Sequence, residues 1–107
     1  MNAFLIENVL EKTIKRILEV AQPRKILIFG SAYRGDMHDN SDIDLLVVVP
    51  SGTHRRRTAH AIYRNLIGVG FAFDIIVVTE EDVEKFRNNS GMIIQHVLEE
   101  GRVLYAA

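Results

Sequence analysis

The segment FGSAYRGDMHDNSDIDLLVVV, residues 29–49, decides the fold of this 107-residue chain. Its second half, Asp42–Val49, is an aliphatic and β-branched run closed by a proline, and such a run predicts a buried strand. A shorter run, Lys25–Phe29, precedes it and ends at a glycine, which predicts another strand. Between them lies the polar stretch Ser31–Ser41, and a loop this long in a small domain is usually functional.

Helices and further strands are predicted on both sides of this segment. Apolar residues between Ala3 and Ala21 recur every three or four positions, which is the spacing of one buried helix face. In chain order, the later expected elements are a helix at Thr53–Ile67 with Thr53 as N-cap, a strand at Phe71–Val78, a short helix opened by a Thr79/Asp82 capping box and ending near Arg87, a helix from Ser90 to Gly101, and an edge strand at Val103–Tyr105. This order predicts one compact domain over residues 1–107.

Composition excludes several classes of protein. The chain has no cysteine, which rules out a disulfide framework, a thiolate zinc site and a cysteine nucleophile. The longest apolar run, Leu45–Pro50, is far shorter than the roughly 20 residues of a membrane helix, and Met1–Leu10 lacks the basic start of a signal peptide. We therefore expect a soluble cytoplasmic protein with no membrane contact. Its formal charge of -1 gives no global attraction to nucleic acid, so direct nucleic-acid binding is not expected.

Three aspartates are candidate metal ligands. Side chains at i and i+2 of a strand point the same way, so Asp42 and Asp44 are predicted to lie side by side at the strand entrance. Like charges this close repel unless a cation compensates, and oxygen ligands suit a hard ion, Mg²⁺ or alternatively Mn²⁺. Asp74 stands alone in an apolar run, where an unpaired buried charge is costly, so an adjacent strand is expected to bring it to the pair as a third ligand.

A phosphate-binding turn is predicted where the first strand ends. Gly30 lets the backbone approach closely, and the Ser31 hydroxyl and turn amides can hold phosphate oxygens, with Arg34 one turn later. A phosphate cradle beside a carboxylate-held metal pair is the arrangement for phosphoryl or nucleotidyl transfer. Each feature alone has a structural alternative: a solvent-facing acid pair, an ordinary turn, or an Asp74 paired with an arginine.

Taken together, Gly30-Ser31, ten intervening residues, Asp42-Ile43-Asp44 and the later strand with Asp74 resemble the GSx10DxD signature and third acid of the DNA polymerase β-like nucleotidyltransferases. The stretches around these motifs are similar to the small branch called minimal nucleotidyltransferases, and the resemblance covers nearly the whole chain. It implies an α/β (α+β) fold with a small mixed sheet flanked by helices. It also implies Mg²⁺-dependent transfer of a nucleoside monophosphate, with AMP from ATP expected, to a hydroxyl acceptor while pyrophosphate leaves.

The resemblance assigns roles to individual residues. Asp42 and Asp44 would hold two Mg²⁺ ions, and Asp74 would complete one of these sites and help to deprotonate the acceptor hydroxyl. The residues expected to contact the nucleotide are Gly30, Ser31, Arg34 and Ser41.

A protein partner is implied in the same way. Many relatives are encoded with a small helical HEPN protein and form toxin–antitoxin pairs, in which the nucleotidyltransferase neutralises a toxic ribonuclease, in some cases by adding AMP to a tyrosine. Two alternatives stay open: a catalytically silent antitoxin that acts by binding alone, and a stand-alone enzyme that modifies a small molecule. The choice of nucleotide, the acceptor and the formation of a homo-oligomer also stay open.

A basic cluster has no assigned role. Arg55-Arg56-Arg57 lies at the start of a predicted helix, where the helix dipole favours acids. Arg57, His60 and Arg64 follow i, i+3, i+7 spacing and would form one basic stripe able to meet an acidic partner, RNA or a triphosphate. A merely solvated face is the alternative.

Overall fold

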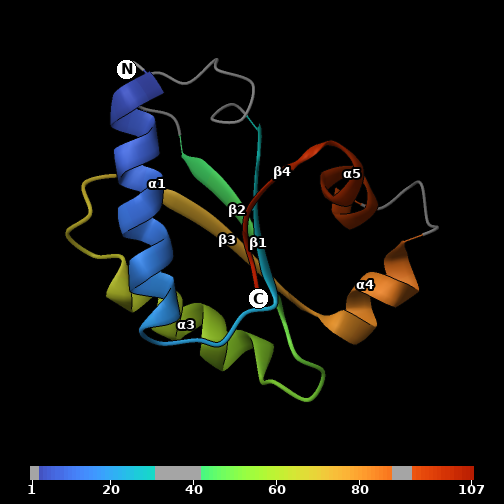
Figure 1. Ribbon diagram of the computed structural model, residues 1–107. Helices are drawn as coiled ribbons and strands as arrows, with labels where there is room; N and C mark the ends of the chain where they lie inside the picture. Colours follow the sequence, from blue (N-terminus) through green and yellow to red (C-terminus); the bar gives the residue numbers. More distant parts are fainter. Residues whose placement is uncertain (1–2, 31–41, 88–92) are drawn as a thin grey trace.

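A four-stranded mixed sheet lies between two pairs of helices in the computed structural model, which describes residues 3–30, 42–87 and 93–107 (Figure 1). The helices are α1 (Ala3–Leu18), α3 (Arg55–Asn65), α4 (Glu80–Phe86) and α5 (Ile93–Glu100). The strands are β1 (Lys25–Phe29), β2 (Ile43–Val49), β3 (Phe73–Thr79) and β4 (Arg102–Ala106). Helices α1 and α3 cover one face of the sheet, and α4 and α5 cover the other.

The strand order is β3-β2-β1-β4, and the directions of the strands are mixed. Strand β1 pairs antiparallel with β2 and with β4, whereas β2 and β3 are parallel. Helix α3 connects the two parallel strands, as a parallel pair requires a crossover. The expected mixed sheet with helices on both faces is therefore confirmed, and so is the C-terminal edge strand.

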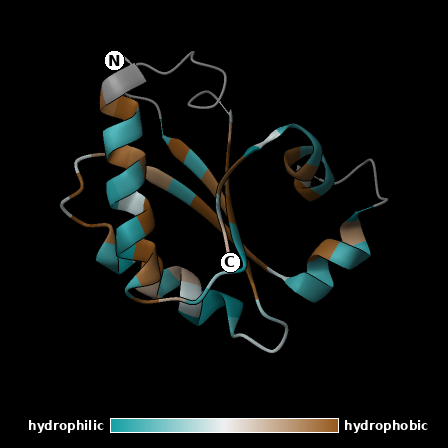
Figure 2. Cartoon of the chain, viewed as in Figure 1, coloured by the Kyte–Doolittle hydropathy of each residue, from teal (hydrophilic) through white to brown (hydrophobic). Residues whose placement is uncertain are grey.

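The side chains of β2 point alternately to the two faces of the sheet, and apolar residues on both faces allow helices to pack on both sides. Ile43, Leu45 and Val47 belong to the core beneath α1 and α3, whereas Leu46 and Val48 belong to the core beneath α4 and α5. All five side chains are buried, as expected for a central strand that has helices on both sides. Helix α1, by contrast, has both apolar and polar residues around its circumference, as Figure 2 shows.

The N-termini of α3 and α4 test the capping predictions. The capping box of Thr79 and Asp82 at α4 is confirmed, with both reciprocal hydrogen bonds present. Thr53 as the N-cap of α3 was wrong, because the cap is His54, whose Nδ1 accepts a hydrogen bond from the Arg57 N–H at 3.1 Å. The Thr53 N–H instead donates to the Pro50 carbonyl, so Thr53 closes the preceding turn.

Element boundaries otherwise moved by a few residues. Helix α1 stops at Leu18, short of the expected Ala21, and α3 is shorter at both ends than Thr53–Ile67. Strand β3 begins at Phe73, two residues after the expected start. The expected start of the last helix at Ser90 lies outside the described residues. No helix within the described ranges has the length and hydropathy needed to cross a membrane.

Candidate active site

Two of the three predicted acids stand opposite each other in the sheet. Asp44 is the second residue of β2 and Asp74 the second residue of β3, and the two are register partners in this parallel pair. Paired residues on neighbouring strands project to the same face of a sheet. The parallel register therefore brings together two carboxylates that are distant in the sequence.

Both acids lie at the open end of the face that α4 and α5 cover. Further along the same face, Leu46 on β2 and Val78 on β3 are buried in the core beneath these helices. At the acid end Asp44 is half-buried and Asp74 is exposed. The burial cost expected for Asp74 therefore does not arise, because its carboxylate stays in contact with water. This position fits a group that must meet a ligand from solution.

Position 30 requires a glycine because the backbone there lies against Asp44. It follows β1 directly, and its φ of 74° lies in the left-handed region that favours glycine. A Cβ on Gly30 would overlap the Asp44 carboxylate oxygen Oδ2. Phe29, the residue before the glycine, is the register partner of Asp44 across the antiparallel pair. The glycine thus lets the backbone at the end of β1 approach the Asp44 carboxylate closely.

The other predicted site residues are placed less fully. Asp42 precedes β2 by one residue and is exposed, and the next residue, Ile43, donates its N–H to the Ala72 carbonyl at 2.9 Å. The predicted nucleotide contacts Ser31, Arg34 and Ser41 lie outside the described residues. Nowhere in the described ranges do three histidine or carboxylate side chains gather closely enough to hold a metal ion. Asp42 is therefore not clustered with the Asp44/Asp74 pair.

The chemistry of these donors fits a hard divalent cation. All the candidate ligands are carboxylate oxygens, which Mg²⁺ and Mn²⁺ prefer. Mg²⁺ usually keeps several waters and takes one or two protein carboxylates together with substrate phosphates. The pair of Asp44 and Asp74, with Gly30 against Asp44, supplies this number of protein ligands.

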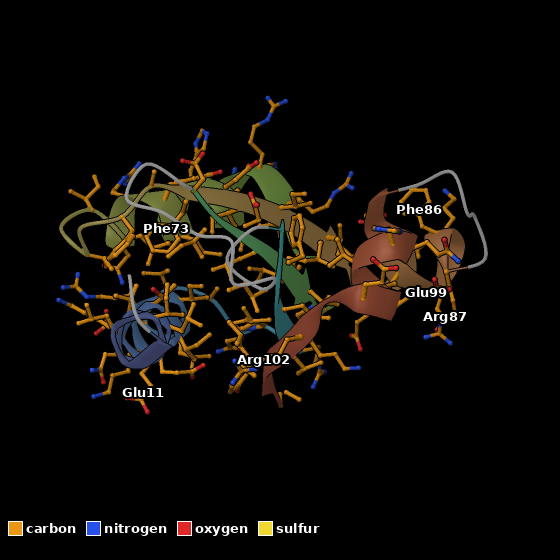
Figure 3. All side chains as sticks on the ribbon, turned by 90° about the horizontal axis from the view of Figure 1, so that it is seen from above. Glu11, Phe73, Phe86, Arg87, Glu99 and Arg102 are labelled. Carbon is orange, nitrogen blue, oxygen red and sulfur yellow. The ribbon has the colours of Figure 1, made fainter. Side chains whose placement is uncertain are left out.

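An ion pair ties the two ends of the chain together on the other face of the sheet. Arg102 at the start of β4 is the register partner of Ile28, and its Nη1 lies 2.8 Å from Glu7 Oε1 on α1. The hydrogen bond and charge of Arg102 lower the pKa of the Glu7 carboxyl. Figure 3 shows Arg102 at β4, on the side of the molecule on which α1 lies. This contact connects α1 to β4, which flanks the strand leading into the Gly30 turn.

A cavity lies at the opposite end of the sheet from the acids. It has a volume of about 780 Å³, and residues at the start of β1, the end of β2 and the helices α4 and α5 line it. Charged side chains of both signs border it, and Arg24 and Glu80 approach each other at 3.6 Å. Neither Asp44 nor Asp74 lines this cavity, so it is separate from the candidate site.

A family model and a relative of known sequence both relate this chain to one family of nucleotidyltransferases. The family model described as "Polymerase beta, Nucleotidyltransferase" matches residues 12–107. The chain is 36% identical over 101 residues to MJ0604 of Methanocaldococcus jannaschii, which is provisionally named a protein adenylyltransferase. That alignment covers 89% of this chain and 97% of the relative.

Solved structures share the fold. A Sulfolobus solfataricus protein provisionally named a nucleotidyltransferase superposes with a TM-score of 0.58 at 24% identity, covering 77% of this chain and 74% of the other. A toxin–antitoxin complex with AMP-PNP gives a TM-score of 0.64 at 23% identity, covering 91% and 73%. A variant MntA–HepT toxin–antitoxin structure, in which two aspartates two positions apart are replaced by glutamate, gives 0.68 at 20% identity, covering 92% and 73%.

Sequence reasoning placed the glycine turn beside the paired acids but did not identify the direct packing of Gly30 against Asp44. It treated Gly30 as part of a phosphate cradle next to a metal pair that includes Asp44. The signal that connects them is the antiparallel pairing of β1 with β2, which places Phe29 opposite Asp44. It also missed Tyr63, whose hydroxyl accepts the N–H of Ile75, the residue after Asp74, at 2.8 Å.

Proposed function

Because this chain belongs to the polymerase beta nucleotidyltransferase family, we propose that it transfers AMP from ATP to a hydroxyl group on a partner protein and requires Mg²⁺. It is a nucleotidyltransferase; the metal, the nucleotide and the acceptor are the parts that we propose. The observation that carries the proposal is the opposition of Asp44 and Asp74 across β2 and β3, with the Gly30 turn against Asp44.

The acids have distinct roles in the proposed reaction. Asp42 and Asp44 would hold the two metal ions, which requires Asp42 to join the Asp44/Asp74 pair when the ions bind, and Asp74 would complete one site. When bound, the ions neutralise the charge of the triphosphate and of the attacking and leaving oxygens. The acceptor hydroxyl passes its proton to Asp74, and its oxygen forms a bond to the α-phosphorus. The bond from this phosphorus to the oxygen bridging to the β-phosphate breaks, and pyrophosphate leaves with that oxygen.

The nucleotide contacts in this proposal come from the turn after β1. Gly30 allows its backbone to approach the triphosphate as closely as it approaches Asp44. Ser31, Arg34 and Ser41 add a hydroxyl, a guanidinium and a second hydroxyl to the phosphates. ATP as the nucleotide is supported by the AMP-PNP in the related toxin–antitoxin structure.

The acceptor is proposed to be a protein. The M. jannaschii relative carries the provisional name of a protein adenylyltransferase, and it matches this chain along almost its whole length. Structures with the same fold are toxin–antitoxin complexes. We therefore propose that this chain is the antitoxin that modifies a helical HEPN-type toxin. In the related variant complex, the replaced aspartates have the same spacing as Asp42 and Asp44.

Label transfer tests this function directly. The purified protein is incubated with ATP labelled at the α-phosphate, with Mg²⁺ and with the protein encoded by the adjacent gene. Label on the partner, lost on chelation of Mg²⁺ and in Asp44→Asn, is the expected result. Absence of label with the wild-type protein contradicts the proposed chemistry. Protection of cells by an Asp42→Asn/Asp44→Asn variant assigns the protein to the silent antitoxins, and label on a small molecule alone assigns it to stand-alone enzymes.

A further inference from the structure

The outward surface of α3 carries a continuous positive face. Ile62 and Leu66 point inward and are buried. At three- and four-residue spacings on the opposite side lie the exposed residues of what we call the α3 basic face: Arg56, Arg57, His60 and Arg64. Long side chains ending in nitrogen project outward from this helix in Figure 3. In Figure 2 polar residues dominate the helix.

The charge of this face is not balanced within the described part of the chain. Helix α3 contains no acidic residue, and its one described ion pair joins Arg55 to Asp82 of α4 at 3.0 Å. None of the described ion pairs involves the side chain of Arg56, Arg57 or Arg64. Cations in the first turn of a helix also oppose its dipole.

Helix α1 shows what an ordinary solvated face looks like in the same protein. Its exposed positions carry both signs of charge, including Glu7, Glu11 and Lys12. Mixed charges at neighbouring positions of a helix attract one another and keep the surface soluble. A face with only positive charge has no such internal compensation, so its natural complement is an acidic surface.

Apolar side chains border the basic face. Ile67 is 75% exposed and Tyr63 is 40% exposed. The Tyr63 ring is held in place because its hydroxyl accepts the Ile75 N–H. Rigid tyrosines and arginines are enriched where proteins bind each other. This combination of fixed apolar and positive side chains fits a protein surface.

The surroundings disfavour nucleic acid as the occupant. The acidic first turn of α4, residues 80–82, lies beside the start of α3, joined to it through the Arg55–Asp82 ion pair. A nucleic-acid backbone bound along the arginines would pass close to these carboxylates, which would repel its phosphates. A folded acidic surface can contact the arginines and leave the carboxylates in water.

We propose that the α3 basic face is the docking surface for an acidic patch on the protein that receives the nucleotide. The identity of this protein rests on the proposed function, whereas the surface does not. Tyr63 at the margin of the face bonds to the N–H of Ile75 on β3, the edge strand that also carries Asp74. The acids belong to the opposite face of the sheet, so a protein docked on α3 has to reach around the edge at β3 to bring its hydroxyl group to them.

Charge reversal on two helices tests the docking surface. Arg57→Glu/Arg64→Glu reverses two charges on the α3 basic face, and Lys12→Glu/Lys15→Glu makes the same change on α1 as the matched control. Affinity for the protein encoded by the adjacent gene is measured by calorimetry without nucleotide. We expect at least a tenfold loss of affinity for the arginine variant and less than a twofold change for the control. The milder Arg57→Gln/Arg64→Gln should give an intermediate loss, and circular dichroism checks that each variant is folded.

The outcomes separate docking from chemistry. Equal affinity losses in both variants, or no binding by the wild-type protein, overturn the docking surface. So does arginine-dependent binding of single-stranded RNA in place of the protein, or arginine-dependent dimerisation measured by light scattering. Arginine-dependent binding without label transfer supports the docking surface and contradicts the proposed function. If the Arg57→Glu/Arg64→Glu variant still transfers label, with an unchanged KM for the partner protein, the proposed function stands and the docking surface is overturned.

Discussion

Asp44 and Asp74 are partners across the parallel β2–β3 pair, and Gly30 lies against the first of them. A parallel pair forms only through a crossover, here by α3, so the two acids depend on a long-range contact that no local pattern specifies. At this open end of the sheet Asp74 is exposed and Asp44 is half-buried.

Asp44→Asn and Asp74→Asn should each lower the rate of label transfer by at least about 100-fold, in the range seen when a charge-stabilising group is removed from an active site. The exposed acid Glu11 on α1 offers a control, since Glu11→Gln should leave the rate within twofold. Initial rates at saturating ATP give the comparison. Activity of both aspartate variants at the wild-type level would remove the carboxylate pair from the mechanism.

Gly30→Ala should destabilise the fold by more than Gly68→Ala. Both glycines have positive φ, which costs a side chain about 1–2 kcal/mol, but only the Cβ at position 30 would meet the Asp44 carboxylate, whereas position 68 is open. Urea unfolding of the two variants measures the difference. The excess cost should fall in an Asp44→Ala background, and a cost that stays the same there would show that the contact with Asp44 is unimportant.

His54→Ala should lower the free energy of unfolding by about 1 kcal/mol, because the Arg57 N–H loses the acceptor that caps α3. His54→Asp should raise the free energy of unfolding, because aspartate is a better cap and its negative charge interacts favourably with the helix dipole and with the neighbouring arginines. Thermal or urea unfolding measures both changes. Thr53→Ala is the control, since Thr53 does not cap the helix, and a larger loss there than at His54 would contradict the assigned cap.

Asp82→Asn should lower stability at neutral pH but not in strong acid. The Thr79 N–H bonded to the Asp82 carboxylate, followed by the Thr79 hydroxyl and the charge of Arg55, lowers the pKa of Asp82 in the folded state, although its partial burial opposes this. A lowered folded pKa means that the stabilisation is complete above the ordinary aspartate pKa and is lost as pH falls through the folded value.

Unfolding in urea at pH 7 and at pH 2 checks the Asp82 prediction. The wild-type protein should exceed Asp82→Asn by about 1 kcal/mol at pH 7, which is typical of a cap, and the two should converge at pH 2. Glu84→Gln is the matched control, because Glu84 and its partner Arg87 are exposed and such pairs contribute little. A difference between wild type and Asp82→Asn that is the same at both pH values would exclude the charge as its cause.

Much of the fold could be predicted because it depends on local patterns. The alternation in Ile43–Val49 assigned the two apolar faces of this strand correctly, and the Thr79/Asp82 pair identified the start of α4. The cap of α3 could not be predicted as well, since Thr53 and His54 are adjacent and both side chains can accept a hydrogen bond. The turn that occupies the Thr53 N–H decides between them.

Local patterns in the amino-acid sequence specify which residues form strands and helices, which faces are apolar, and that acids stand where the apolar face of β2 begins, because these properties repeat over a few neighbouring residues. The parallel register of Asp44 with Asp74, the packing of Gly30 against Asp44 and the exposure of Asp74 follow from tertiary packing. These relationships depend on backbone pairing between strands separated by a loop or a helix. Such pairing is selected by how the whole sheet packs between its two helical layers.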